Sequence, residues 1–576
     1  MKPAARRAPL PGLPAWRANL LLLVMLAWFV GLAGRALWLQ ALNNDFLQRK
    51  GESRYSRVIE IGASRGMIVD RNNEPLAIST PVEAVAASPG DVEAEPAELR
   101  KLAKLVNISN DELRTRLSDT DREFVYLRRQ LPPEQAERVV RLGIPGIFLQ
   151  REHRRYYPAG EVMSHIIGFT GVDEKGQEAL ELAFESTLAG KPGSRRVIRD
   201  RLGRIVEDVE SIRVPQNGQK LTLSIDARIQ YLAFRELKAA VVAHRAKAGG
   251  IVVLDAESGE ILAMANLPTY NPNNRGKLDA HRMRNRVVTD LFEPGSTLKP
   301  FTAAAALEAG LYKPETVIQT APGQLTIGNR TIHDAHPQGA LTVAQVIQKS
   351  SNVGTAKMGL ALSSEALWSM FTRAGFGTQP RSGFPGEVSG RLRGYATWKP
   401  IEQATMSYGY GLSVSLLQLA RAYTMFASDG VLYPVTLLKR DGPPQGTRVV
   451  SAQTALAVRK MLELAAQPGG TAPGAQVAGY TVAGKTGTAH KMEGNGYAAN
   501  RYVASFVGMA PASHPRVVIA VMIDEPTGQY YGGAVAAPVF SQVAAGTLRF
   551  LAVPPDAPAK TTVLNPENVP LVREEV

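Results

Sequence analysis

The chain has 576 residues, of which 45% are hydrophobic and 20% are charged, as is usual for a globular protein of two to four domains. Its formal net charge of +14 suits an anionic surface or polymer, but the positive charge is spread along the chain, so nucleic acid is not favoured as a partner. The absence of cysteine excludes disulfides, a thiol nucleophile and cysteine-based zinc or iron–sulfur sites.

The N-terminal segment joins basic residues to a long apolar run. Lys2, Arg6, Arg7 and Arg17 precede the run, which continues beyond Arg35 to Gln40. We expect residues 1–17 to form a cytoplasmic arm and residues 18–40 to form one uncleaved transmembrane helix, which leaves the body of the protein outside. A cleaved signal peptide is the alternative, although the apolar run is long for one.

Residues 41–219 are charged and carry no catalytic constellation. We expect a spacer or docking module of small helices and hairpins. The predicted elements are strands at 57–61 and 67–69, a turn at 70–73, and helices at 96–106, 133–142 and 179–188.

Residues 220–552 alternate between strand and helix patterns in a particular order. Two strand groups enclose a long helical region, which indicates an antiparallel sheet assembled from both ends of the domain with an inserted helical lobe. The fold class is therefore mixed α/β (α+β, layered). The predicted elements are a helix at 227–246, a hairpin at 250–255 and 260–265, strands at 502–509 and 516–523, and a helix at 535–551. Residues 553–576 are rich in proline and are expected to be a disordered tail.

The first chemical motif is Ser296-Thr297-Leu298-Lys299, which follows the Pro294-Gly295 break. We expect Ser296 in the first turn of a helix and Lys299 one turn further on the same face. A lysine held beside a serine can act as its base if the amine is kept neutral. The pair alone is weak, because a chain of this length contains about one such match by chance.

The second motif is Ser350-Ser351-Asn352, between a helix and Val353-Gly354. A hydroxyl and a carboxamide two residues apart can point into one cleft, where the amide can hold a peptide group. Taken alone, these residues are more typical of a helix cap.

The third motif is Gly484-Lys485-Thr486-Gly487-Thr488, which with Gly479 formally matches a P-loop. A P-loop needs a helix that begins at the Lys-Thr pair. Strand-forming residues precede this pair, and a loop through Gly494 and Gly496 is expected after it, so the segment is predicted to be a strand at a sheet edge.

Other chemistries have weaker support. His333 and His336 have no third metal ligand at a recognisable spacing, so no metal site is expected. Asp524-Glu525 follows a strand and is more typical of solvated carboxylates than of a glycosidase dyad.

The order Ser-x-x-Lys, Ser-x-Asn, Lys-Thr-Gly behind an outward-facing anchor is typical of penicillin-recognising serine enzymes. Over nearly its whole length, the chain resembles class B penicillin-binding proteins of the division (septal) type found in Gram-negative bacteria. The segments that carry the resemblance are Arg65-Gly66, Asp70-Arg71, Tyr156–Gly160, Tyr270–Asn273, Phe292–Pro300, Tyr408–Gly411 and Gly484–Thr488.

The resemblance implies a transpeptidase domain (220–552) on an elongated pedestal with a dimerisation-like domain (41–219). It implies that Ser296 attacks a peptidoglycan stem peptide at its D-Ala-D-Ala end, that Lys299 takes the serine proton, and that Ser350 relays it to the leaving amine. The backbone N–H groups of Ser296 and Thr488 would form the oxyanion hole. Substrate binding falls to Asn352, which would also help to fix Lys299, and to Lys485, Thr486, Gly487, Thr488, Tyr408, Tyr410 and Tyr531.

The resemblance also implies partners and a place in the cell. No cofactor or metal is expected. The partners would be stem peptides on lipid-linked precursor, β-lactams, a membrane glycan polymerase and division-complex proteins. The protein would lie in the inner membrane with its catalytic domain in the periplasm. His490 stands where relatives often carry Arg or Lys, which weakens the positive charge near the carboxylate site.

Three alternatives stay open at this point. The chain could be an auxiliary or elongation-type class B transpeptidase. It could hydrolyse its acyl-enzyme as a carboxypeptidase or β-lactamase, although Ser351 lies where class A β-lactamases carry Asp. It could also be a non-catalytic β-lactam sensor or scaffold, although sensors carry more than one transmembrane span and a cytoplasmic effector domain.

Overall fold

A computed structural model describes residues 15–39, 56–122, 124–199, 205–276, 278–494 and 496–558. The chain divides into two compact units. Unit 1 contains residues 1–63, 81–152 and 191–216, and unit 2 contains residues 64–80, 153–190 and 217–576.

Helix α1 (Ala15–Leu37) is long and apolar enough to cross a membrane, with a mean hydropathy of 2.2 over its best window. It begins three residues before the predicted span at 18–40. Most of the arm predicted at 1–17 lies outside the described residues.

Unit 1 contains a small antiparallel sheet and a helical subdomain. The sheet has the order β1-β6-β7. Leu102, Val106, Leu113, Leu127 and Val139 form the centre of the core shared by the helices and strand β4. The predicted helical region thus contains a strand as well. The elements are β1 (Ser56–Ile61), β6 (Gly193–Arg199), β7 (Ile205–Arg213), α3 (Pro96–Val106), α4 (Asn110–Leu117), β4 (Val125–Leu131) and α5 (Pro133–Val140).

Strands β3 (Pro75–Ala87) and β5 (Ile147–Tyr156) contribute residues to both units. In unit 2, β2 (Ile68–Val69) pairs antiparallel with the start of β3 and parallel with β8 (Leu221–Thr222). The turn predicted at 70–73 connects β2 and β3 in this hairpin. Short helices α6 (Ser164–Ile167), α7 (Ala179–Ala183) and α8 (Glu185–Leu188) follow, so the single helix predicted at 179–188 is interrupted at Phe184.

The main sheet of unit 2 has five antiparallel strands in the order β10-β9-β19-β18-β17. Its first two strands come from one end of the domain and its last three from the other, as the sequence predicted. Strand β17 lies at the edge. The strands are β9 (Ala248–Asp255), β10 (Ile261–Leu267), β17 (Ala483–Glu493), β18 (Gly496–Ala510) and β19 (Val517–Asp524).

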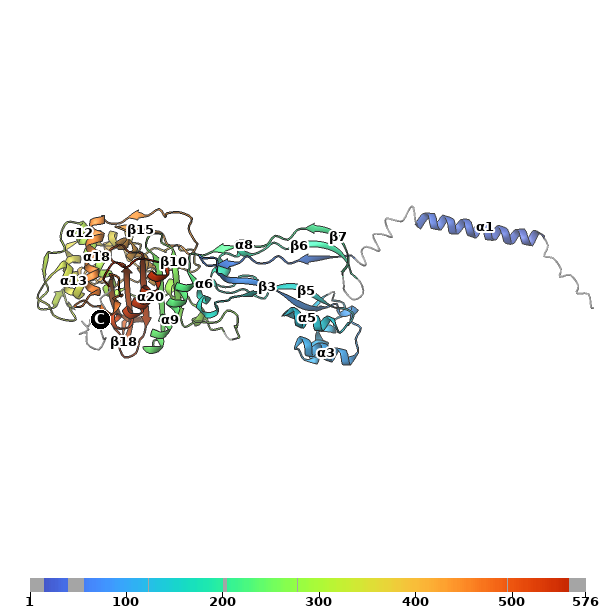
Figure 1. The fold of residues 1–576 in the computed structure, drawn as a ribbon, viewed down its shortest axis with the longest axis horizontal. Helices are drawn as coiled ribbons and strands as arrows, with labels where there is room; N and C mark the ends of the chain where they lie inside the picture. The colour runs from blue at the N-terminus through green and yellow to red at the C-terminus, as the bar shows by residue number, and fades with distance from the viewer. Residues whose placement is uncertain are drawn as a thin grey trace, which may run out of the picture. The chain divides into compact units, whose positions relative to one another are not determined.

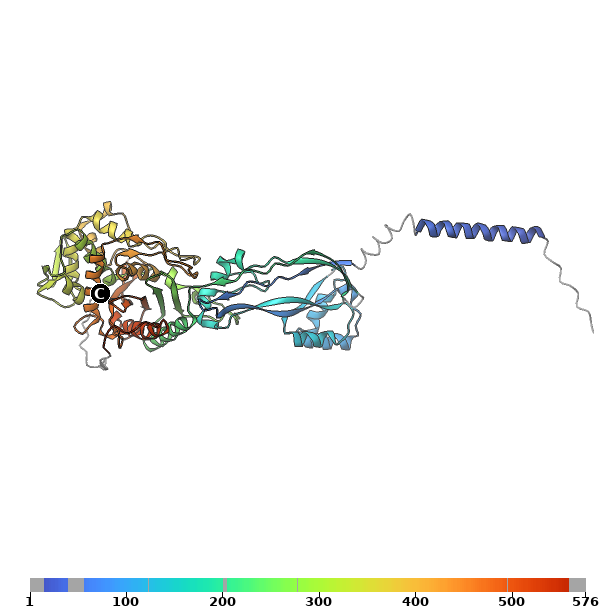
Figure 2. The ribbon, with the colours of Figure 1, turned by 45° about the horizontal axis from the view of Figure 1, so that its top comes forward.

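Every residue of strands β9 and β19 is buried, because helices cover both faces of this sheet. Helices α9 (Ala227–Ala243, green) and α20 (Ala537–Phe550, red) lie side by side on one face (Figure 1). Helices α11 (Arg286–Thr289) and α17 (Leu416–Ala427) pack on the other. Figure 2 shows the same layers from a second direction.

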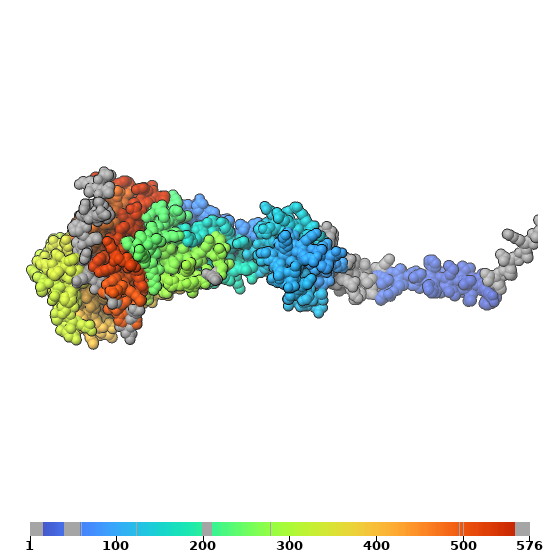
Figure 3. All heavy atoms as spheres, turned by 90° about the horizontal axis from the view of Figure 1, so that it is seen from below, coloured from blue at the N-terminus to red at the C-terminus, as the bar shows by residue number. Residues whose placement is uncertain are grey.

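The inserted lobe lies between the two strand groups in sequence, and its yellow surface is prominent in Figure 3. It contains helices and small two-stranded sheets. Its elements are α12 (Lys299–Glu308), β11 (Val317–Gln319), β12 (Gln324–Ile327), β13 (Arg330–His333), β14 (Ala340–Thr342), α13 (Val343–Lys349), α14 (Asn352–Ala361), α15 (Ser364–Arg373), α16 (Pro400–Ser407), β15 (Val431–Leu432), β16 (Thr447–Arg448) and α18 (Ala452–Ala466). Two short helices lie outside the lobe: α10 (Ala280–Met283) precedes it, and α19 (Gly532–Val535) follows β19.

Two expectations differ from the structure near the C-terminus. Strand β17 continues to Glu493 and forms a hairpin with β18, where a loop was expected after Thr488. Residues 553–558 were assigned to the tail, yet the Asp556 carboxylate accepts a hydrogen bond from the Thr481 backbone N–H at 2.7 Å. Residues 559–576 lie outside the described residues.

Candidate active site

The nucleophile turn comprises residues 294–298, with Ser296 at its centre. Gly295 to Leu298 form a short 3₁₀ helix, and α12 begins at Lys299. Gly295 has φ +52°, which favours glycine. Ser296 therefore lies one step before the α-helix rather than inside its first α-turn, and it is half-buried.

The loop Tyr408–Gly411 packs against this turn and is hydrogen-bonded to it. The Gly295 N–H donates to the Gly409 carbonyl at 3.1 Å. Gly409 has φ +99°, and a Cβ there would lie 2.0 Å from the Gly295 carbonyl oxygen. The buried Tyr423 hydroxyl donates to the Thr297 carbonyl at 2.7 Å. The turn is thus fixed by contacts that only glycine permits at 409.

Lys299 points into the protein and reaches the second motif. Its side chain is fully buried. The Nζ atom lies 3.0 Å from Ser350 Oγ and donates a short hydrogen bond to the Ser350 carbonyl. Lys299 and Ser350, to which the resemblance assigns the roles of base and proton relay, are therefore in contact.

The second motif joins two helices and is itself held by a buried carboxylate. Ser350 ends α13 in a left-handed conformation with φ +61°, and Ser351 caps α14 by accepting from the Gly354 N–H. Asp334 accepts hydrogen bonds from Ser351 Oγ at 2.7 Å and from the Val353 N–H at 2.9 Å. The helix-cap interpretation thus holds for Ser351, the residue next to Ser350.

One pocket, open to solvent, connects the first two motifs. Asn352 lines it, and its amide nitrogen donates to the His333 carbonyl at 3.0 Å. The residues that line it are Ser296, Asp334, Ala335, His336, Gln338, Lys349, Ser350, Ser351 and Asn352. Within the described part of the chain, no group of three or more His, Cys, Asp or Glu residues could hold a metal ion.

The third motif lies on edge strand β17, against the nucleophile turn. A Cβ on Gly487 would lie 2.9 Å from the Pro294 carbonyl oxygen, so glycine allows the strand to approach the turn closely. Lys485 is fully buried, and its Nζ lies 3.2 Å from Thr486 Oγ1. Thr488 Oγ1 accepts from the Gly532 N–H at 3.1 Å, which places Tyr531, the preceding residue, near this end of the motif.

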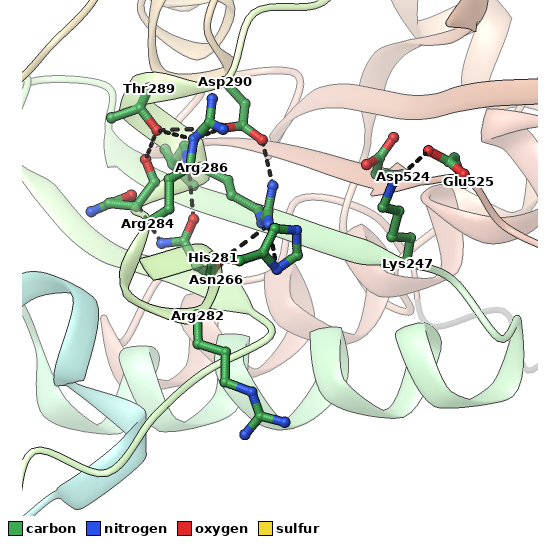
Figure 4. A network of polar contacts seen from close by, with 12 residues as sticks. Lys247, Asn266, His281, Arg282, Arg284, Arg286, Thr289, Asp290, Asp524 and Glu525 are labelled. Atoms are coloured by element: carbon green, nitrogen blue, oxygen red, sulfur yellow. Dashed lines mark hydrogen bonds and ion pairs between the residues drawn. The ribbon is translucent and has the colours of Figure 1, made fainter. Parts of the chain in front are cut away.

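Two charged clusters hold the elements that lead into the site (Figure 4). Asp290, at the end of α11, binds Arg284 and Arg286 at 2.7 Å each, just before the nucleophile turn. The other cluster in Figure 4 contains Lys247, which contacts Glu525 at 3.2 Å. Lys491 on β17 also reaches this cluster and contacts both Asp524, the last residue of β19, and Glu525. The prediction that Asp524-Glu525 is simply solvated is wrong, because these ion pairs fasten the edge strand to the sheet.

A group of aromatic rings from the Tyr408–Gly411 loop and from β18 lies near the site. Tyr408 and Tyr410 are 5.8 Å apart at their centroids, and Tyr410 contacts Tyr497 edge-on at 5.9 Å. The ring centroids of His490 and Tyr502 are 4.8 Å apart. His490 therefore packs among rings on β18 instead of standing alone.

Sequence reasoning missed Asp334 and Glu293. Asp334 lies 17 residues from the serine that it holds, and no motif spans that distance. Glu293 is within the quoted Phe292–Pro300 segment, but the hydrogen bond that it accepts from the Gly411 N–H depends on the fold.

Comparisons with known protein families match two regions of the chain. Residues 249–545 match the penicillin binding protein transpeptidase domain, and residues 60–223 match the penicillin-binding protein dimerisation domain.

Several relatives match over nearly the full chain. The probable peptidoglycan D,D-transpeptidase PenA of Neisseria gonorrhoeae is 45% identical over 97% of both chains. The peptidoglycan D,D-transpeptidase FtsI of Escherichia coli is 43% identical over 94% of this chain and 93% of its own. The apo transpeptidase domain of Burkholderia pseudomallei penicillin-binding protein 3 is 50% identical over 58% of this chain and 98% of that structure, with a TM-score of 0.55. The chain therefore belongs to the penicillin-binding protein transpeptidase family.

Proposed function

We propose that the protein is a serine D,D-transpeptidase that cross-links peptidoglycan stem peptides during septal wall synthesis and is inhibited by β-lactams. The observation that carries this proposal is the contact of buried Lys299 with Ser350, on a cavity that Ser296 shares. Desolvation favours the neutral form of an amine, so Lys299 is suited to accept a proton.

In the acylation half-reaction, Ser296 Oγ attacks the carbonyl of the penultimate D-Ala, and its proton passes to Lys299 Nζ. The N–H groups of Ser296 and Thr488 stabilise the oxyanion, each by about 3 kcal/mol. The peptide C–N bond then breaks, Ser350 Oγ delivers the proton to the leaving amine, and terminal D-Ala departs.

Substrate binding is assigned to the cleft walls. An edge strand has unpaired backbone groups, so β17 can pair with an extended stem peptide. Lys485 and the hydroxyls of Thr486 and Thr488 bind the terminal carboxylate, and Gly487 keeps the strand close to Ser296. Asn352 holds the substrate amide, while Tyr408, Tyr410 and Tyr531 line the cleft.

In the second half-reaction, an amine from a neighbouring stem attacks the acyl carbonyl, forms the cross-link and releases Ser296. A carboxypeptidase or β-lactamase would use the same motifs, but it needs a water and a base positioned for deacylation. Transfer is favoured because Ser351 occupies the β-lactamase Asp position and is already engaged by Asp334.

The proposal extends to location and partners. Helix α1 anchors the chain in the inner membrane, and the basic residues before it keep the N-terminus cytoplasmic, so the catalytic domain faces the periplasm. A membrane glycan polymerase supplies the nascent strand, and division-complex proteins bind the pedestal. The boundaries 41–219 and 220–552 for pedestal and transpeptidase domain are part of the proposal.

Labelling with a fluorescent penicillin tests the acyl-enzyme. Wild type should be labelled and Ser296→Ala should not, and the label should persist for much longer than seconds. Absence of label on wild type, equal label on Ser296→Ala, or release within seconds would contradict the transpeptidase assignment.

Depletion in the native bacterium tests the septal role. Filamentation is the expected phenotype. Normal division after depletion would instead identify an auxiliary or elongation enzyme.

A further inference from the structure

The loop formed by residues 467–472 follows α18 and is folded tightly against the end of that helix. The Ala472 N–H donates to the Ala465 carbonyl at 3.0 Å. Gly469 has φ +88°, and a Cβ on Gly470 would lie 2.3 Å from the Ala465 carbonyl oxygen, so both positions favour glycine. Helix α18 packs against α13, which ends at the second motif, and against β17, which carries the third. The loop therefore leaves a helix that contacts elements of both motifs.

The loop is attached to the second motif through Lys349. This lysine is the last residue of α13 and directly precedes Ser350. It is half-buried and lines the same pocket as Ser296, and its Nζ atom donates a hydrogen bond to the Gly469 carbonyl at 2.9 Å. The end of α13 is therefore tied to the loop directly beside the serine that we propose as the proton relay.

The loop is attached to the third motif through Thr471, which is 3% exposed. Thr471 Oγ1 lies 2.9 Å from Thr486 Oγ1, and either hydroxyl can be the donor. Thr486 Oγ1 also accepts a hydrogen bond from Lys485 Nζ at 3.2 Å. A Cβ on Gly533 would lie 2.3 Å from the Thr471 carbonyl oxygen, so glycine permits this close approach. The loop thus contacts the hydroxyl that we assign to the terminal carboxylate.

We propose that the 467–472 loop is a positioning element that fixes the distance between the two cleft walls, with Lys349 and Thr471 as its attachments. The proposal rests on the proposed acyl-enzyme chemistry, in which Ser350 protonates the leaving nitrogen and Thr486 binds the terminal carboxylate. In terminal D-Ala this nitrogen and this carboxylate are bonded to the same carbon atom, and penicillin has the same arrangement. The ligand therefore reaches both walls only at one separation, and misplacement by about 1 Å can slow a reaction about 100-fold.

Two single variants each release one attachment of the loop. Thr471→Val keeps the shape of the side chain and removes the hydroxyl, and Lys349→Met keeps a long side chain and removes the donor. Each change should lower the maximal rate of acylation by a labelled penicillin, by about fivefold for Thr471→Val and about threefold for Lys349→Met. The half-saturating penicillin concentration should stay within about twofold, because both walls must act on the ligand together only in the transition state.

The double variant distinguishes one positioning element from two local contacts. If both contacts act through the same loop, releasing its second attachment adds nothing, so Thr471→Val/Lys349→Met should be no slower than Thr471→Val alone. Two independent local effects would instead multiply to about 15-fold. A merely structural role would lower the melting temperature and leave the maximal acylation rate of the folded protein unchanged.

Two matched controls remove the same chemical groups elsewhere in the lobe. Lys357→Met removes another lysine contact with a carbonyl, that of Gln319 at 2.6 Å. Thr454→Val removes another contact between two hydroxyls, with Ser451 at 3.1 Å near the start of α18. Both controls should acylate at the wild-type rate.

The proposal is overturned if either single variant keeps a maximal rate within about twofold of wild type, if the two effects multiply in the double variant, or if the controls are slowed equally. If Thr471→Val does not fold, Lys349→Met decides by the same limit, because Lys349 is only half-buried. Failure of wild type to acylate at all would instead overturn the proposed function.

Discussion

Ser350 illustrates how one backbone conformation positions the hydroxyl that we propose as the proton relay. With φ +61°, its carbonyl and its Oγ both face Lys299 Nζ. The motif Ser-x-Asn predicted the residue type, but a left-handed serine between two helices could not be read from the sequence. The part played by Asp334 was equally invisible, because β13 and α14 come together only in the folded lobe.

Ser350→Gly tests the hydroxyl without disturbing the backbone. Glycine adopts the left-handed conformation readily and keeps the carbonyl that accepts from Lys299. Loss of the proton relay should slow penicillin acylation by about 100- to 10,000-fold, with little change in melting temperature. Stopped-flow labelling measures the rate. Ala552→Gly, an exposed left-handed residue with φ +54°, is the control and should leave the rate unchanged.

At the scale of elements, β17 is an edge strand of the sheet that is also held by the ion pairs of Lys491. The alternation of strand formers before Lys485 predicted the strand and its edge position. Its extension to Glu493 was missed because Gly494 and Gly496 appeared to mark a long loop, whereas they form the tip of a hairpin. The ion pairs of Lys491 supply the support, and no local pattern connects residue 491 to residues 524 and 525.

Lys491→Met should weaken this support. Desolvation opposes the charge of Glu525, but hydrogen bonds from Lys491 and Lys247 lower its pKa overall. A carboxylate with a lowered pKa contributes stability above its unfolded value and loses it as pH falls through the folded value. We expect the substitution to lower the free energy of unfolding by about 1–3 kcal/mol at pH 7. Below about pH 4, the variant should differ less from wild type.

Urea unfolding at the two pH values measures this effect. Lys247→Met is the control, since Lys247 is half-exposed and reaches Glu525 alone at 3.2 Å. It should cost about 0–1 kcal/mol. An equal loss for Lys491→Met at both pH values would rule out the ion-pair explanation.

At the scale of the whole molecule, the chain combines an apolar N-terminal helix, a region that matches the penicillin-binding protein dimerisation domain and a region that matches the transpeptidase domain. Composition and pattern predicted this order and the layered α/β class. They could not predict the buried centre of residues 64–80 and 153–190, where Glu181 binds Arg65 at 2.6 Å and Arg155 at 2.7 Å. Arg65 was recognised from the motif, but its partner is 116 residues away.

Glu181→Gln should destabilise unit 2 strongly, because it removes the carboxylate that two buried guanidinium groups share, although Arg65 keeps its ion pair with the less buried Glu185 at 2.8 Å. The expected loss is about 3–5 kcal/mol, measured by thermal unfolding of the purified full chain. Glu137→Gln, which removes an exposed pair with Arg141, should cost about 0–1 kcal/mol. Comparable losses in the two variants would refute a special role for the buried cluster.

The central claim is that Ser296 transfers an acyl group to an amine. The direct measurement is mass spectrometry of products formed from a stem peptide ending in D-Ala-D-Ala, incubated with the protein and an excess of a D-amino acid as acceptor. We expect a product in which the D-amino acid replaces terminal D-Ala, and this product should be absent with Ser296→Ala and blocked by penicillin. A product formed equally by Ser296→Ala, or hydrolysis without any transfer, would contradict it.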